Sequence, residues 1–292
     1  MTDGQPWYLS RDVLLLLAGG AIGIVGSVIG AVVEYLLQAR RDRPQVMREQ
    51  YLAALRYPDP RESLRGFDLS GRDLRWQNLT MADLREADLS RALLQEASLD
   101  GANLQGANLQ SANLAKASLH HANLESANLR AATLKAVEFD EANLKRSDLR
   151  GADLSEARLD GASLKGANLD GSTLVDPKWR LVWELVNRPG PGRNLRGADL
   201  EDAVLSQACL HSADLEEAQL QGSDMRECDL REASLAGANL QWANLAGANL
   251  LGADLTAARL AGAEISPSTL MPHGWQDQVS SKPDREPPAP AQ

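Results

Sequence analysis

A leucine recurs every five residues along most of this chain, from Leu64 to Leu174 and again from Leu195 to Leu270. At three of these positions another large apolar residue stands instead, namely Phe139, Met225 and Ile265. A small residue, mostly alanine, stands two places before the leucine, and a polar residue, mostly Asp, Asn, Ser or Thr, stands directly before it. The pattern is therefore a five-residue unit with two variable positions.

A period of five fits neither a regular helix nor a regular strand. At about 100° per residue, successive leucines would lie about 140° apart around a helix. In a strand, successive leucines would fall on opposite faces because side chains alternate. Within one unit, however, the small residue and the leucine are two apart, so a short extended segment points both the same way. A chain that runs extended, turns and repeats forms a solenoid with the leucines inside.

This unit resembles the A-(D/N)-L-x-x repeat of the pentapeptide-repeat proteins, and the stretch 101–110, GANLQGANLQ, shows it twice. The resemblance implies an all-β solenoid, a right-handed quadrilateral β-helix of about ten coils in two blocks, with four units per coil. We expect all the leucine-type positions to face inward. We also expect ladders of polar residues one coil apart, such as Asp88, Asn108, Asn128, Asp148 and Asn168.

Breaks in the repeat divide the chain into seven segments. They are a short N-terminal tail (1–12), a transmembrane helix (13–37), a juxtamembrane linker with a capping helix (38–61), β-helix block 1 (62–174), a helical insertion (175–194), β-helix block 2 (195–270), and a terminal cap with a disordered Pro-rich tail (271–292).

The segment 13–33 contains no charged residue. As a helix it would span about 32 Å, enough for a hydrocarbon core of roughly 30 Å. Arginines cluster directly after it, at positions 40, 41 and 43, which predicts that the β-helix lies in the cytoplasm. We therefore expect a single-pass protein of a bacterial inner membrane. A cleaved signal peptide or a reversed anchor would instead place the rod outside the cytoplasm.

Small residues recur at every fourth position of this segment, a spacing that allows close packing of helices in lipid. They predict a homo-oligomer through the face formed by Gly19, Gly23, Ser27 and Ala31, with Gly26 and Gly30 alongside. The alternative is that glycine is simply common in membrane helices.

In the insertion, Asp176 is a suitable N-cap and Pro177 suits the first helical turn. An apolar stripe follows at Trp179, Val182, Trp183 and Val186. We expect this helix to lie on the solenoid or to seal the seam between the blocks. The alternative is a partner-docking helix with exposed tryptophans.

Charge is unevenly distributed along the chain, whose formal net charge is −10. Residues 195–265 contain 12 acidic and 4 basic residues, a net charge of −8. This excess is either an ordinary solvated surface or a surface for a basic partner. The acidic partner surface would comprise Glu201, Asp202, Glu216, Glu217, Glu227 and Glu232.

The sequence contains no recognisable catalytic, metal or cofactor site. His120, His121 and His211 fall on outward turn positions without metal spacing, and the two cysteines, Cys209 and Cys228, should point to opposite sides of the wall. Nothing forms a basic footprint for direct nucleic-acid binding. We therefore expect a non-enzymatic, membrane-tethered protein-interaction scaffold. The alternative is a DNA mimic that binds or protects a topoisomerase such as gyrase, as some members of the resembled family do.

Overall fold

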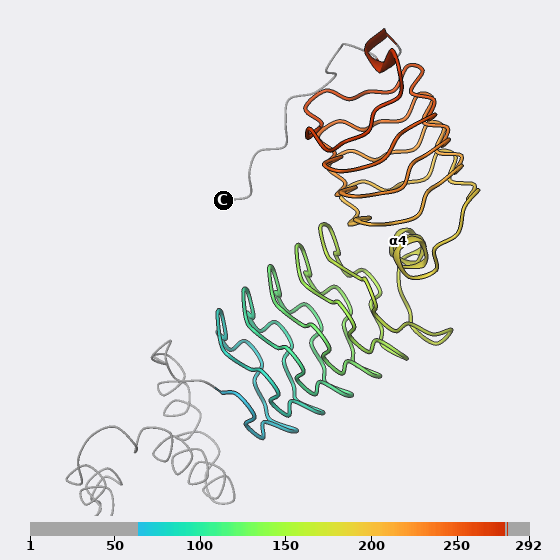
Figure 1. The fold of residues 1–292 in the computed structure, drawn as a ribbon. Helices are drawn as coiled ribbons and strands as arrows, with labels where there is room; N and C mark the ends of the chain where they lie inside the picture. The colour runs from blue at the N-terminus through green and yellow to red at the C-terminus, as the bar shows by residue number, and fades with distance from the viewer. Residues whose placement is uncertain (1–63, 278, 280–292) are drawn as a thin grey trace, which may run out of the picture. The chain divides into compact units, whose positions relative to one another are not determined.

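The repeat folds as a β-helix whose coils each contain 20 residues. Parallel backbone bridges join Asp68 to Asp88 and continue coil by coil to Leu174 in block 1, and they join Asn194 to Asp214 and continue to Leu270 in block 2. The structure, a computed structural model, describes residues 64–277 and 279, and Figure 1 shows the stacked coils. The expected right-handed quadrilateral β-helix is confirmed.

The corners of each coil are two-residue turns that directly follow the leucine. The second turn residue adopts a left-handed backbone conformation, as at Gly101 (φ 64°) and Glu141 (φ 58°). Glycine takes this conformation freely, whereas a glutamate must be held in it. Neighbouring coils hold it, because the Glu141 N–H donates to the carbonyl of Asp160 at 2.8 Å. On each side of the coil, therefore, one residue between two corners points outward to solvent.

Leucine and alanine fill the interior. Leu84, Leu109 and Leu144 are 0% exposed, as is the larger Phe139. Each such leucine contributes roughly 1.5–3 kcal/mol on burial. Where serine replaces alanine, as at Ser147, its hydroxyl donates inside the wall to the carbonyl of Leu144 at 2.8 Å. The core is thus a continuous apolar column within each block.

Both blocks end with the same change of register. The last bridges join residues 21 apart, Asp153 to Leu174 and Asn249 to Leu270, because the final turn starts one residue late. Leu174 and Leu270 consequently turn outward and are 56% and 47% exposed, so the expectation that these two face inward is wrong. Ile265 keeps the 20-residue register, because Asn244 and Glu264 still form a bridge, and it is 36% exposed in the last coil.

A threonine occupies the inward position in the last unit of each block. The Thr173 hydroxyl donates to the carbonyl of Leu149 at 3.0 Å, and the Thr269 hydroxyl donates to the carbonyl of Leu245 at 2.8 Å. Each hydroxyl also accepts the N–H of the residue three positions earlier, at 3.1 Å. These bonds close the two terminal turns in the same way.

The insertion contains the helix α4, Pro177–Asn187, and a short 3-10 helix η2, Trp275–Asp277, follows block 2. The predicted N-cap is confirmed, since the Asp176 carboxylate accepts the N–H of Lys178 at 2.8 Å. Within the described residues every backbone bridge stays inside one block. The blocks meet instead through contacts such as the Gly161 N–H donated to the carbonyl of Asp202 at 2.8 Å.

Candidate interaction surfaces

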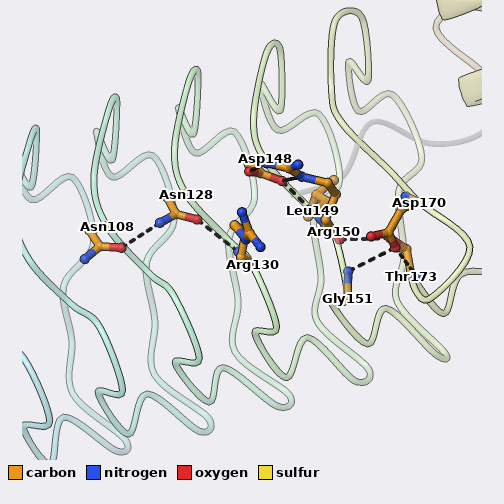
Figure 2. Close-up of polar contacts among 9 residues, drawn as sticks. All are labelled: Asn108, Asn128, Arg130, Asp148, Leu149, Arg150, Gly151, Asp170 and Thr173. Atoms are coloured by element: carbon orange, nitrogen blue, oxygen red, sulfur yellow. Dashed lines mark hydrogen bonds and ion pairs between the residues drawn. The ribbon is translucent and has the colours of Figure 1, made fainter.

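The predicted polar ladder forms along one side of block 1, and Figure 2 shows part of it. The Asn108 amide donates to Asp88, and the Asn128 amide donates to Asn108, both at 3.0 Å. At the next coil the Asp148 carboxylate is held by Arg150 instead, at 2.8 and 2.6 Å. The bond to Arg150 keeps the pKa of Asp148 below its ordinary value. The ladder is therefore rigid, and most of its polar groups already have partners.

Asp170 organises the terminal turn of block 1 (Figure 2). Its carboxylate accepts the hydroxyl and the N–H of Ser172, at 2.6 and 2.9 Å, and the N–H of Gly151 at 3.3 Å. Hydrogen bonding to Ser172 is the main reason that the pKa of Asp170 falls to about 2. The carboxylate acts as a structural acceptor for this turn.

The six acidic residues predicted as one partner surface do not form one. Glu216 and Glu217 form the turn one coil after Arg196, at the same corner, and both pair with that arginine. Glu227 lies one coil above Gln207 and Glu232 one coil above Ser212, at two further corners. Glu201 and Asp202 form the turn at the fourth corner. The prediction of a single six-residue surface is therefore wrong, because successive five-residue units face different sides.

A different set of acidic residues does gather along one corner. Asp100, Asp140 and Asp160 occupy equivalent turn positions in block 1, and the junction contact of Gly161 brings Asp202 to the same corner. We call the acidic corner the set Asp100, Asp140, Glu141, Asp160, Glu201 and Asp202.

Carboxylates of the acidic corner repel one another across the junction. Burial raises the pKa of Asp202, and the neighbouring charges of Glu201 and Asp160 raise it further. Burial also raises the pKa of Asp140, against the attraction of Arg158. Both shifts mean that a negative charge here lacks full compensation. A cationic side chain of a partner would relieve this repulsion.

Three nitrogen-bearing side chains already lie beside the acidic corner. The two ring nitrogens of His120 lie 3.1 Å from Glu138 and 3.2 Å from Asp140, and Arg158 lies 3.4 Å from Asp140. Lys178 of α4 lies 4.0 Å from Asp160 and 3.5 Å from Asp199. In each pair at least one side chain is a third exposed or more, and such pairs contribute about 0–1 kcal/mol each. The cationic side chains offset part of the negative charge. Lys178 also holds the first turn of α4 at the junction between the blocks.

The helix α4 packs against the end of block 1. Trp179 and Trp183 are each 6% exposed, and the Trp183 ring N–H donates to the carbonyl of Ala167 at 2.7 Å. Asn187 closes the contact by donating to the carbonyl of Leu164 at 3.0 Å. The docking alternative, which required exposed tryptophans, is therefore wrong for this conformation, and the expected helix on the solenoid is found. Leu185, rather than Val186, completes the buried stripe with Val182.

The predicted membrane span 13–37 and its face of Gly19, Gly23, Ser27, Ala31, Gly26 and Gly30 lie outside the described residues. In the part of the chain that the structure does describe, no helix is both long enough and apolar enough to cross a bilayer.

Among residues 64–277 no group of three His, Cys, Asp or Glu side chains is placed to hold a metal ion. Cys209 and Cys228 are free thiols, and burial raises the pKa of the Cys228 thiol to about 12. A thiol with such a pKa is unreactive at neutral pH.

The acidic corner is the feature that the sequence analysis missed. The net charge of a stretch of sequence does not reveal it, because side chains meet at intervals of one coil. Writing the sequence in rows of 20 residues would align Asp100, His120, Asp140 and Asp160 in one column.

Two family models match the repeats. The model described as pentapeptide repeats matches residues 63–95, 192–222, 213–250 and 233–266, and the model described as a pentapeptide repeat region matches residues 92–169. Together they span both blocks, and the chain belongs to the pentapeptide-repeat family.

Solved structures similar to the chain include two cyanobacterial members of this family. The pentapeptide repeat protein Rfr23 from Cyanothece 51142 is 31% identical, with 38% of this chain and 89% of Rfr23 covered and a TM-score of 0.38. HetL from Nostoc sp. strain PCC 7120, described as involved in heterocyst differentiation regulation, is 32% identical, with 77% and 95% covered and a TM-score of 0.32.

QnrB1, described as a plasmid-mediated fluoroquinolone resistance protein, is 17% identical, with 69% of this chain and 92% of QnrB1 covered and a TM-score of 0.36. No curated protein sequence matched the chain.

Proposed function

We propose that the chain is a non-catalytic protein-interaction scaffold that binds a basic partner along its acidic corner. The observation that carries this proposal is that carboxylates of both blocks gather at one corner, where the Gly161 N–H bonded to the carbonyl of Asp202 brings Asp160 and Asp202 together. The interior supports it, because leucines such as Leu109 and Leu144 are 0% exposed and fill the coil. A partner must therefore bind the outward side chains, which recur about every 4.8 Å along the rod, once per coil.

Affinity capture from membranes tests this proposal. The bait is the full chain, compared with the variant Asp160→Asn/Glu201→Gln, which neutralises two carboxylates of the acidic corner. The matched control is Glu216→Gln/Glu217→Gln, which removes the same charge at another corner. We expect the acidic-corner variant to lose a specific basic partner at least several-fold, and the control to retain it.

Equal retention by both variants would contradict the proposal. Capture of a topoisomerase, with inhibition of gyrase supercoiling by the purified chain, would instead support the DNA-mimic alternative.

We further propose that residues 13–37 anchor the rod in a bilayer, with the rod in the cytoplasm. The 21-residue uncharged run at 13–33 and the arginines that follow it support this part of the proposal. The full chain should stay in the membrane fraction after an alkaline carbonate wash, and a chain lacking 13–37 should not. Recovery of both in the soluble fraction would refute the anchor.

A further inference from the structure

One side of block 1 is lined by short polar side chains. Its outward residues begin with Asp83 and continue with Asn103, Asn123, Asn143 and Ser163, and these last four we call the 103 face. The Asn123 amide donates to Asn103 at 3.2 Å, and the Asn143 amide donates to Asn123 at 3.0 Å. Each asparagine oxygen also accepts a backbone N–H two residues on, as Asn143 accepts that of Lys145 at 3.1 Å. The face is therefore rigid, and the central side chains have little bulk to hinder a close approach.

The two edges of the 103 face carry opposite charges at the same height. In the coil of Asn143, Asp140 and Glu141 form one corner, and Lys145 and Arg146 form the other. In the next coil Asp160 stands opposite Lys165. One coil earlier His120 and His121 stand opposite Glu125, so the carboxylate of that coil lies at the other edge.

One charged group at each edge of the Asn143 coil is well exposed. The side chain of Glu141 is 67% exposed and that of Arg146 is 76% exposed. Within one chain they have neighbours at their own edge, with Glu141 at 3.2 Å from His121 and Arg146 at 3.7 Å from Glu125. Exposed pairs of this kind exchange partners at little cost.

We propose that a second copy of this chain packs on the 103 face, with the two rods parallel and related by a two-fold axis that runs along them. Rotation about this axis exchanges left and right edges and leaves height unchanged. Each acidic edge therefore meets the basic edge of the other copy in the same coil. Each contact between the edges joins a residue with the residue five positions further on in the other copy, and the outward residues between the edges meet their own counterparts, as an isologous interface requires.

This arrangement pairs opposite charges in two successive coils at once. It pairs Glu141 with Arg146 and Asp160 with Lys165, each across the interface and each twice, and it places His120 opposite Glu125. Antiparallel rods would place the two acidic edges together and the two basic edges together, which like-charge repulsion disfavours. In the parallel arrangement the N-terminal coils of the two copies lie at the same end of the dimer.

Cysteine cross-linking tests the geometry. On the two-fold axis an outward residue of the 103 face meets its own counterpart, so Asn123→Cys should form a covalent dimer under mild oxidation. Asn128→Cys is the matched control, because it lies in the same coil and in an equivalent ladder but on the adjacent side. Both variants are made in the full chain with Cys209→Ser. Cys228 can stay, because its side chain is 1% exposed.

We expect Asn123→Cys to give at least five-fold more covalent dimer than Asn128→Cys. The position tolerates cysteine, since Cys209 occupies an equivalent outward position in block 2. Equal yields from the two variants, or no dimer from either, would overturn the proposal.

A charge exchange tests the pairing itself in the Asn123→Cys chain. Glu141→Arg alone and Arg146→Glu alone each place like charges across the interface, and each should lower the dimer yield several-fold. Glu141→Arg/Arg146→Glu restores opposite charges and should restore the yield. Thermal melting shows that each variant is folded. Single variants that cross-link as well as the parent chain, or a double variant that fails to recover, would contradict the pairing.

Discussion

At the scale of single residues, the polar position before each leucine has a structural role in its own turn. The Asp88 carboxylate accepts the N–H of Ser90 at 2.9 Å, and Asn128 accepts that of Arg130 at 3.2 Å. Short oxygen-bearing side chains suit this bond, which explains why Asp, Asn, Ser and Thr dominate the position. The role of this position in the turn could be predicted from the sequence. The exceptional residue Asp170, which belongs to an irregular turn, could not.

Replacement of Asp170 should make stability depend less on pH in the acid range. The folded pKa of about 2 lies below the ordinary aspartate pKa of 3.8, so the carboxylate contributes stability that is fully present above pH 3.8. That contribution is lost as the pH falls through the folded pKa. We expect Asp170→Ala to melt at a lower temperature than the parent chain at pH 7, with the difference shrinking towards pH 2.

Circular dichroism at a series of pH values provides the measurement. Glu184→Ala, which removes a carboxylate within α4 and leaves its N-cap in place, is a control for general charge loss. A difference in melting temperature for Asp170→Ala that stays constant down to pH 2 would contradict the assigned role.

At the scale of elements, the repeat and the insertion helix were predictable, and the ends of the blocks were not. Leu174 and Leu270 keep the five-residue spacing in sequence, yet both turn outward because the last turn begins one residue late. Spacing alone cannot reveal such a shift. The Ser-Thr-Leu sequence shared by residues 172–174 and 268–270 is the signal that could have indicated it.

The hydrogen bond from Trp183 should stabilise α4 on the end of block 1. Trp183→Phe retains most of the buried ring and leaves the carbonyl of Ala167 without this donor. We expect a loss of about 1–3 kcal/mol in the free energy of unfolding. Chemical denaturation measures it.

Trp76→Phe is the matched control, because the Trp76 ring is 55% exposed and its N–H binds the exposed Glu96. The control should change stability by less than about 0.5 kcal/mol. Equal effects of the two substitutions would show that the buried hydrogen bond contributes little.

At the scale of the whole molecule, surface properties depend on columns rather than on stretches of sequence. Block 2 has the greater negative charge, but its carboxylates are spread over four corners, and Arg196 pairs with two of them. The carboxylates that crowd together come from both blocks, as the effect of Asp160 on Asp202 indicates. The family, the coil and the core therefore follow from the sequence, whereas the interaction surface requires the 20-residue geometry.

The claim on which the account depends is that the leucines fill the inside of the coil and the neighbouring turn residues face solvent. Thermal melting of Leu109→Arg beside Gln110→Arg tests it most directly, because the two positions are adjacent and the new side chain is the same. Leu109 is 0% exposed and Gln110 is exposed. We predict that Leu109→Arg loses more than about 4 kcal/mol and unfolds the coils around it, because it buries an unpaired charge. Gln110→Arg should melt like the parent chain, and a Leu109→Arg protein that did the same would contradict the account.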